Sequence, residues 1–494
     1  MSEYMIPAQK LWEAVGLPPE PLSRLVLSEK PDPAVNSSFK LGSAAQTVIG
    51  LSGLAAAHLH ELRTSCKQSV RVNARHAVIE FKSEQYYTLD GKLPRLSDFW
   101  DDLAGVYETK DNNYVRIHTN FPHHRKGILD ILGCESSKQA IAEALLQWNS
   151  VDFETEAAQR NMVATAMRQF SQWDEHPQGK ALAGTPPVEL IKVGDAPKRQ
   201  CHPGVYPLEG IRVLDLTRVL AGPVCGRTLA AHGADVLLVT SPNLPALPLL
   251  DTDTSRGKRT TQLDLTDSAD KARLFDLVKD ADVFLQAYRP GGLRDKGFGV
   301  DDVVQARPGI VYASLNAYGW NGPWKHRRGF DSLVQTATGF NVAEAEAYAT
   351  YDGKNIEYPP LPKPLPMQAL DHAAGYLLAF GINAALCKTI TEGGSWEVRV
   401  SLAAVGQWIR SLGQLDPSVA FGEGKPLPRH EIPLNQEIEE YSTTYKQWGD
   451  FLGISTPLRM TAIKHAAELS ETPVKEHLAP IVLDAHHAVW LPRP

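Results

Sequence analysis

The sequence predicts an α/β protein with a doubly wound, mostly parallel sheet, and two observations lead to that class. Residues 210–239 read GIRVLDLTRVLAGPVCGRTLAAHGADVLLV, which is a strand, a turn, a short helix and a second strand with nothing between them. Beyond them, short apolar runs alternate with helical patterns as far as residue 316. Such alternation is typical of parallel strands whose connecting helices cover both faces of the sheet.

The first strand is expected at 211–216, and the turn after it is suited to an anion. Pro223 follows Gly222 where the first turn of a helix tolerates a missing N–H, so the backbone amides from Leu220 to Val224 point beyond the sheet edge. The turn reads TRVLAGP rather than G-x-G-x-x-G, so NAD and FAD are not the expected ligands. Further strands are expected at 236–239, 260–265, 283–286 and 310–315, with helices at 267–279, capped by Asp267, and at 301–307.

Composition excludes several classes of protein. Hydrophobic residues make up 43% and charged residues 22% of the 494, which excludes general disorder and predicts two or more packed units. The 50 basic and 57 acidic side chains form no block of one sign, so no nucleic-acid partner is expected. Five widely spaced cysteines form no C-x-x-C pair, which favours a reducing, cytoplasmic location. We see no leader and no run of about 18 apolar residues, so no membrane partner is expected.

An internal repeat appears at an offset of 328 residues. Residues 53–78 align without gaps with residues 381–406, and Val70-Arg71-Val72 coincides with Val398-Arg399-Val400. Both copies read as a helix, a polar turn, a strand and a further helix, which indicates a partial duplication. The alternative is that two such units look alike by chance. Residues 96–198, between the copies, are helical in pattern with one strand signal at 113–118.

Two basic clusters are expected at neighbouring strand ends. Arg256, Lys258 and Arg259 precede the third strand, and Lys325 to Arg328 follow the fifth. Together they suit a polyphosphate, and the alternative is a pair of solvated loops. Ligands of doubly wound sheets bind beyond the carboxyl ends of the strands, which are Thr217, Ser241, Thr266, Tyr288 and Asn316.

Asp371 and Asp331 are the candidate carboxylates. Asp371 stands just before a helix that opens with Ala373-Ala374-Gly375, so its ordinary role is to cap that helix. The small residues would also clear room above the carboxylate, which could then attack an activated acyl group. Asp331 is expected to start a helix and to be kept ionised by Arg328. The chain has neither H-E-x-x-H nor G-x-S-x-G, so no metal site and no serine-hydrolase elbow are expected.

In combination, the motifs resemble those of the family III CoA-transferases, a group that also contains acyl-CoA racemases. The resemblance covers residues 207–412, and it implies a Rossmann-like large domain that carries CoA at its strand ends, a small domain on long linkers and an interlocked homodimer. Beside 210–239, the matching segments are SRGKRTTQLDL at 255–265, ADVFLQAYRPGGLRDKGFG at 281–299, ASLNAYG at 313–319 and ALDHAAGYLLAFG at 369–381.

The resemblance assigns roles to individual residues. Asp371 matches the catalytic aspartate of the family. The implied CoA contacts are Arg218, Val219, Leu220, Ala221, Leu263, Tyr288 and Arg328, to which the first basic cluster adds Lys258 and Arg259; the acyl group and the acid are expected to meet Phe330, Asp331 and His372.

The chain also departs from the family pattern. Ser241 stands where transferases often carry a basic residue, and Ala287 precedes the aromatic contact, so the phosphate end of CoA is expected to be held differently. Racemases have a histidine where this chain has Phe330, so exchange of a proton at the α-carbon lacks one of its two bases.

The parts of the module are rearranged along the chain. After an arm at 1–38, residues 39–200 resemble the second half of a family module with its small α+β domain. Residues 201–414 resemble the large CoA-binding domain, and residues 415–494 look like a wrapping tail. Ser43 stands at the position of the first copy that corresponds to Asp371, so one complete active site per chain is expected. The chain is expected to form a homodimer or to stand by itself for half of an interlocked dimer.

The predicted function is CoA transfer from an acyl-CoA to a carboxylic acid, through an aspartyl anhydride and an aspartyl-CoA thioester on Asp371. Coenzyme A enters as substrate, and no tightly bound cofactor is expected. Two alternatives remain at this point. One is an acyl-CoA racemase or isomerase that pairs Asp371 with a base other than Phe330, and the other is a catalytically silent protein that binds CoA esters.

Overall fold

The computed structural model describes residues 2–95, 100–356, 358–446, 459–475, 479–480 and 482–494. At its centre lies a seven-stranded sheet in the order β10-β9-β8-β11-β12-β13-β7, parallel except for β7 at one edge. The strands are β8 (Arg212–Leu216), β9 (Asp235–Thr240), β10 (Arg259–Gln262), β11 (Val283–Gln286), β12 (Val311–Asn316), β13 (Ser395–Ser401) and β7 (Glu189–Gly194). The predicted parallel α/β sheet is therefore confirmed, although β7 was not expected.

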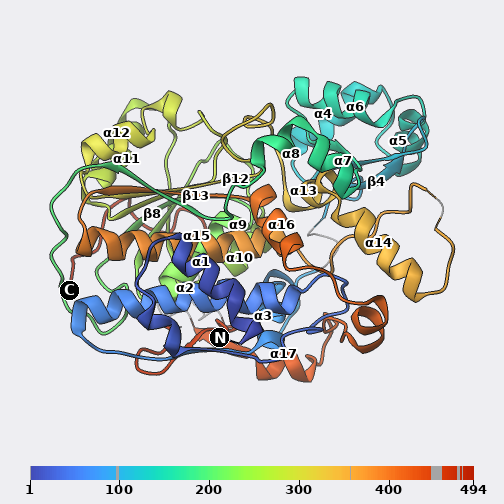
Figure 1. The fold of residues 1–494 in the computed structure, drawn as a ribbon. Coiled ribbons are helices and arrows are strands. Elements are labelled where there is room, and N and C mark those ends of the chain that lie inside the picture. The colour runs from blue at the N-terminus through green and yellow to red at the C-terminus, as the bar shows by residue number, and fades with distance from the viewer. Residues whose placement is uncertain (1, 96–99, 357, 447–458, 476–478, 481) are drawn as a thin grey trace.

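Helices cover both faces of this sheet (Figure 1). On one face lie α9 (Ala221–Ala231) and α15 (Ala369–Thr391), which share the largest apolar core with β8, β11 and β12. On the other lie α11 (Ser268–Asp280) and α12 (Val300–Ala306), which pack on Leu214, Phe284 and Tyr312. Asp267 caps α11 as expected, because its side chain accepts the backbone N–H groups of Ala269 and Asp270.

The central helix of the fold is α15, which is buried along most of its length. By length and composition it could cross a membrane, but 89% of its most apolar window is covered by the rest of the protein. Small residues let its neighbours approach closely. A Cβ placed on Gly375 would lie 2.6 Å from the carbonyl oxygen of Ala221 and 2.9 Å from Cβ of Val224, both in α9.

The internal repeat is visible in the fold. The first copy consists of α2 (Leu41–Thr64), β2 (Val70–Val72) and α3 (Ala74–Glu80). The second consists of α15, β13 and α16 (Leu402–Ser411), and both α2 and α3 begin 328 residues before their counterparts. The two long helices pack against each other, with α2 beneath α15 in Figure 1. The first copy thus covers the face of α15 that the sheet leaves open.

A smaller unit at the upper right of Figure 1 has its own apolar core. It contains an antiparallel sheet of β4 (Gly105–Glu108), β5 (Tyr114–Ile117) and β6 (Ala164–Ala166). Of these three strands, only β5 was expected from the sequence. The helices of this region are α4 (Pro122–Leu132), α5 (Lys138–Leu145), α6 (Ser150–Gln159), α7 (Phe170–Glu175) and α8 (Pro177–Leu182).

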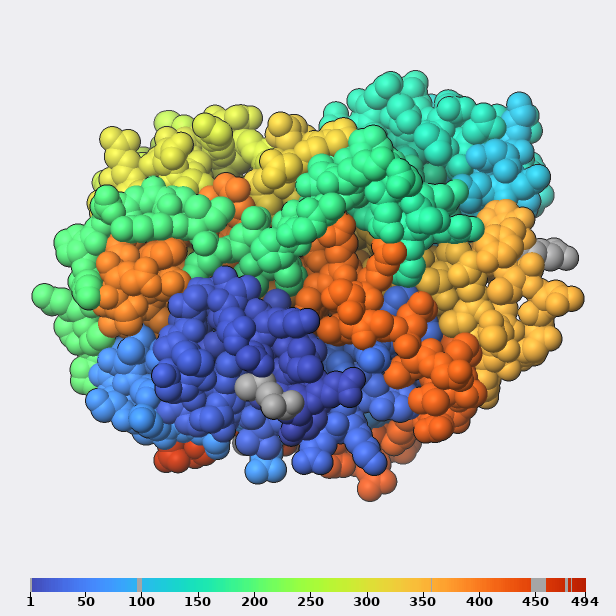
Figure 2. Space-filling model, viewed as in Figure 1, coloured from blue at the N-terminus to red at the C-terminus, as the bar shows by residue number. Residues whose placement is uncertain are grey.

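The C-terminal residues pair with the N-terminal part of the chain. β15 (Arg459–Ile463) lies between β14 (Ser442–Lys446) and β3 (Thr88–Leu89), and β16 (Glu468–Leu469) pairs with β2. On the face in Figure 2, N-terminal residues (blue) adjoin residues beyond 400 (orange). The remaining elements are η1 (Glu3–Met5), α1 (Ile6–Ala14), η2 (Glu20–Arg24), β1 (Leu25–Leu27), η3 (Ser83–Gln85), α10 (Pro248–Thr254), η5 (Arg294–Lys296), α13 (Asp331–Thr338), α14 (Phe340–Tyr351), η6 (Ser418–Glu423) and α17 (Gln436–Glu440).

The close contact between α9 and α15 predicts the effect of one methyl group. Gly375→Ala should lower the free energy of unfolding by about 1 to 3 kcal/mol, because the added carbon meets backbone that cannot move aside. The higher helix propensity of alanine, worth about 1 kcal/mol, offsets only part of this loss. Gly422→Ala is the matched control, since its nearest neighbour is a Tyr351 ring carbon at 3.5 Å. Denaturant unfolding of the two variants measures the difference, and equal stability would contradict the packing.

Candidate active site

A cavity of about 280 Å³ opens at the carboxyl ends of the strands, where β8 separates β9 from β11. In sheets of this kind the reversal of strand order at such a point creates the ligand crevice. The cavity is lined by residues after β8 (Arg218, Val219), β9 (Leu244), β11 (Ala287, Tyr288, Arg289, Pro290) and β12 (Asn316, Ala317), by 327–330, and by Phe121, His123 and His124 of the smaller unit. Predicted residues Arg218, Val219, Tyr288, Arg328 and Phe330 therefore meet in one place.

The lining of this cavity is basic. Among the described residues, four arginines and two histidines contribute to it, and no aspartate or glutamate does. The guanidinium of Arg327 donates a hydrogen bond to the backbone carbonyl of Ala164 at 3.0 Å. Arg328 donates a hydrogen bond to Nε2 of His124 at 2.7 Å. Burial, assisted by the neighbouring His123 and Arg328, lowers the pKa of His124 to about 3, so this ring accepts the bond as a neutral group. The cavity is consequently suited to a multiply charged anion.

The turn between β8 and α9 is strained in a way that serves a ligand. Val219 has a φ of 75°, a left-handed conformation that a β-branched residue adopts at a cost of about 1–3 kcal/mol. Beyond it, the amides of Leu220, Ala221 and Gly222 donate to no acceptor within the described residues. These groups lie at the start of α9, where the helix dipole also favours negative charge.

A buried ion pair supports this turn from below. Nζ of Lys258 lies 2.8 Å from a carboxylate oxygen of Asp215 and 2.9 Å from the carbonyl oxygen of Pro223. The other oxygen of Asp215 accepts the hydroxyl and amide hydrogens of Thr217. Both charged side chains are fully buried. Lys258, predicted to contact CoA, thus holds the turn in place and is closed to solvent.

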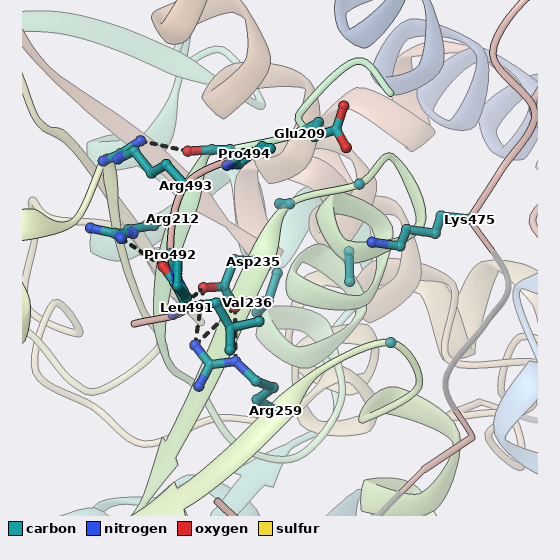
Figure 3. A pocket seen from close by; sticks show the side chains of 15 residues that line it. Glu209, Arg212, Asp235, Val236, Arg259, Lys475, Leu491, Pro492, Arg493 and Pro494 are labelled. Carbon is teal, nitrogen blue, oxygen red and sulfur yellow. Dashed lines mark hydrogen bonds and ion pairs between the residues drawn. The ribbon is translucent and has the colours of Figure 1, made fainter. Parts of the chain in front are cut away.

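Arg259 of the first basic cluster lies at the opposite ends of the strands, which corrects the sequence-based expectation. Arg259 begins β10, so it lies at the amino ends of the parallel strands. Figure 3 shows it in a second cavity, of about 210 Å³, beside Asp235 and the C-terminal residues 491–494. Its guanidinium pairs with Asp235 at 2.9 Å and donates to the Val489 carbonyl. Leu263, another predicted contact, is buried in the core on the α11 side.

Asp371 is the third residue of α15 rather than its cap. The capping role belongs to Asp331, whose Oδ2 accepts the backbone N–H groups of Leu370 at 2.8 Å and of Asp371 at 2.9 Å. The carboxylate of Asp371 itself receives no hydrogen bond from the described residues. Asp371 is buried, with 9% of the residue exposed.

Several carboxyl groups crowd around Asp371. Burial raises the pKa of Asp331 to about 6. Burial, then the charges of Asp331 and Glu84, raise the pKa of Asp371 well above its ordinary value. Arg328, expected to keep Asp331 ionised, instead contacts His124. His372 was expected to contact substrate, but it is fully buried and pairs with Glu84, with 3.0 Å between Nε2 and Oε2.

The small residues after Asp371 do not leave an empty space above it. Gly375 lies one turn further along α15, where the carbonyl of Ala221 fills the available room. This contact brings the start of α9, with its free amides, to the same end of α15 as Asp371. Phe330 lines the basic cavity and directly precedes Asp331, so the cavity and Asp371 are two neighbouring parts of one site.

Side chains from the N-terminal half complete this site, and the sequence gave no local signal for them. Glu84 comes from η3, directly after the first copy of the repeat. The ring of His118 stacks on Phe330, with 4.0 Å between ring centroids. His123 and His124 come from the first turn of α4. These residues lie more than 200 positions before Asp371, so only the fold relates them to it.

The first copy of the repeat has a corresponding but closed site. Asp32 accepts the amides of Gly42 at 2.8 Å and Ser43 at 3.2 Å, as Asp331 does for Leu370 and Asp371. The hydroxyl of Ser43 also bonds to Asp32. A Cβ on Gly42 would lie 1.9 Å from the carbonyl oxygen of Pro31, so a loop fills this position.

Known proteins match the part of the chain that forms this sheet and its site. The model of CoA-transferase family III matches residues 208–426. An acetyl-coenzyme A transferase of Hypoxylon pulicicidum is 37% identical over 215 residues, which are 42% of this chain and 35% of that protein. A probable fatty acyl-CoA transferase of Mycobacterium tuberculosis is 35% identical over 237 residues, which are 45% of this chain and 57% of that protein.

A shorter match links the chain to the succinyl-CoA:glutarate CoA-transferase of Mus musculus, at 34% identity over 29% of this chain and 35% of that protein. A crystal structure of a hypothetical protein from Mycobacterium tuberculosis has a TM-score of 0.37 and 33% identity, covering 42% of this chain and 58% of that one. The matched regions span about a third to three fifths of the lengths of these relatives. Residues 208–426, with the parallel strands β8 to β13 and the helices α9 and α15, belong to CoA-transferase family III.

Proposed function

We propose that this protein transfers coenzyme A from an acyl-CoA thioester to a carboxylic acid, with Asp371 as the nucleophile. The observation that carries the proposal is the carboxylate of Asp371, which has no hydrogen-bond partner among the described residues. Its backbone is bound by Asp331, and Phe330, the residue before Asp331, lines the basic cavity. Several relatives of residues 208–426 are named as CoA-transferases, which supports the same activity.

The basic cavity would hold the CoA moiety. Arg218, Arg289 and Arg328 supply positive charge for its phosphates, and Tyr288 and Val219 supply apolar surface for the pantetheine arm. The thioester would then lie toward Phe330 and Asp371. Lys258 and Arg259 have no part in this binding, because Asp215 and Asp235 occupy them.

The chemistry proceeds through covalent intermediates on Asp371. Its carboxylate attacks the donor thioester carbonyl, and CoA leaves as a thiolate, which gives a mixed anhydride of Asp371 and the donor acid. The thiolate then attacks the aspartyl carbonyl of the anhydride, which releases the donor acid and leaves an aspartyl-CoA thioester. The acceptor carboxylate attacks this thioester, and the displaced thiolate finally takes the acceptor acyl group and regenerates Asp371.

Two features of the site favour these steps. The free amides of Leu220, Ala221 and Gly222 are placed to stabilise the oxyanions that form on each attack. The lack of hydrogen bonds to the Asp371 carboxylate leaves its lone pairs available, and its crowding by other carboxyl groups favours conversion into an uncharged ester or anhydride.

Proton exchange at the α-carbon is less well supported. His118 stands beside Phe330, where racemases of this family carry a histidine, so a base is present from another part of the chain. Burial lowers the pKa of His118 to about 3, however. An imidazole of that basicity holds a proton poorly near neutral pH, so the geometry favours transfer.

Loss of the nucleophile should abolish the reaction. Asp371→Asn should reduce transfer by at least about 10⁴-fold, since no other group can form the covalent intermediate. Hydroxylamine added with an acyl-CoA should convert Asp371 of the native protein into a hydroxamate, which peptide mass spectrometry detects. Asp267→Asn is the matched control, because asparagine caps α11 equally well. An unmodified Asp371 in a folded, CoA-binding protein would exclude the proposed mechanism.

Removal of a cavity arginine should weaken the binding of the phosphates alone. Arg289→Ala should raise the KM for an acyl-CoA by about 10-fold, and the KM for the same acyl group on pantetheine should not change. Arg273→Ala, an exposed arginine of α11, serves as control. Steady-state kinetics at two ionic strengths measure both KM values. An equal rise in the KM for the acyl-CoA and for the acyl-pantetheine would show that Arg289 does not contact the phosphates.

The raised pKa of Asp371 predicts the pH dependence. The nucleophile must be ionised, so kcat/KM should fall as the pH is lowered through a range above that of an ordinary carboxyl group. Asp331→Asn removes a neighbouring negative charge, which should move this acid limb to lower pH. A pH–rate profile of both proteins measures the shift, and a limb that stays in place or moves upward would contradict the coupling of the two carboxyls.

A further inference from the structure

Arg116, on β5 of the smaller unit, is a half-buried cation without a partner. Its side chain makes no hydrogen bond and no ion pair with the described residues, and its Nε is buried. Buried arginines in folded proteins are normally paired, because an unpaired charge loses its hydration without compensation. Such a group is a strong indication of a ligand that carries negative charge.

Strand alternation turns Arg116 toward the site of Asp371. Val115 and Ile117 point into the core of the smaller unit. Side chains at 116 and 118 therefore share the opposite face of the strand. His118 on that face stacks on Phe330 at 4.0 Å, and Phe330 directly precedes α13. The face that carries Arg116 is thus packed at the start of α13.

Electrostatics agree with this placement. Burial lowers the pKa of Arg116, and the charge of Asp331 acts in the opposite direction. The guanidinium consequently lies within reach of the field of Asp331, whose carboxylate binds the backbone of Asp371. Asp331 forms no ion pair with Arg116, and its oxygens instead accept hydrogen bonds from Gln335, Leu370 and Asp371.

We propose that Arg116 binds the second carboxylate of a dicarboxylic acid whose first carboxylate reacts at Asp371. This inference rests on the proposed function and names the class of acid for the same site. The reacting carboxylate must reach the Asp371 carbonyl itself, among the carboxyl groups of Asp331 and Glu84. Arg116 lies on the face of β5 that packs at the start of α13, where it can hold the far end of the acid.

The same contact applies to both substrates. In the proposed reaction the donor acid leaves and the acceptor acid enters at the same aspartyl carbonyl, so both use one acid-binding position. Arg116 therefore selects donors that are CoA monothioesters of dicarboxylic acids, and acceptors that are dicarboxylic acids. An aliphatic acid of equal length with one carboxylate would leave the guanidinium unpaired.

Glutarate and pentanoate, which have the same number of carbons, test this selection. Native protein should use glutarate with a kcat/KM at least about 30-fold higher than that for pentanoate. Arg116→Gln, which keeps a long polar side chain, should remove most of that preference by raising the KM for glutarate, and Arg116→Lys should restore part of it. Arg160→Ala, at an exposed arginine of the same unit, is the control that should keep native kinetics.

Calorimetry separates this proposal from the proposed activity. Unreacted protein should bind glutarate more tightly than pentanoate, and Arg116→Gln should abolish the difference. If native protein prefers glutarate and Arg116→Gln does not, while Asp371 fails to form a hydroxamate, only the proposed transfer mechanism is wrong. If native protein binds and uses the two acids equally, or if Arg116→Gln weakens both alike, the role of Arg116 in acid recognition is wrong.

Discussion

The carboxylate of Asp331 joins the elements on which the site depends. It starts α13, and it accepts the first amides of α15, so it fixes the backbone of Asp371 directly. The residue before it, Phe330, packs on His118 of the smaller unit, so the smaller unit contacts the chain at the same point. A buried carboxylate in this role substitutes for the water that would otherwise satisfy the start of the central helix. The position of Asp371 is thus determined by a residue forty positions earlier in the sequence.

The two helix starts at the site have opposite roles. The first amides of α15 are satisfied by Asp331, so they are closed to any ligand. The first amides of α9 have no acceptor among the described residues, and the strained Val219 holds them in that state. The buried pair of Lys258 and Asp215 stabilises the strained turn from within the protein. One helix start therefore positions a side chain, and the other offers its own backbone.

The sequence predicted the elements whose signals are local. The strands β8, β9, β11 and β12 are short and largely apolar runs, and Asp267 marks the start of α11. Predictions failed where position depends on distant partners. The cap of α15 comes from forty residues upstream, and Arg259 lies away from the carboxyl ends of the strands because it is the first residue of a parallel strand. Arg116 could not be found at all, since its surroundings exist only after the smaller unit packs on α13.

The closed site at Asp32 and Ser43 has a consequence for how this chain can change over evolutionary time. In a symmetric assembly of identical subunits, every substitution enters each active site at once. Two copies of an element within one chain are free of that rule. One copy carries Asp371 where the other carries Ser43, and both have a carboxylate, Asp331 or Asp32, that binds the amides at the start of the helix. Within one chain, the two copies of this element can therefore share an architectural contact and differ at the position beside it.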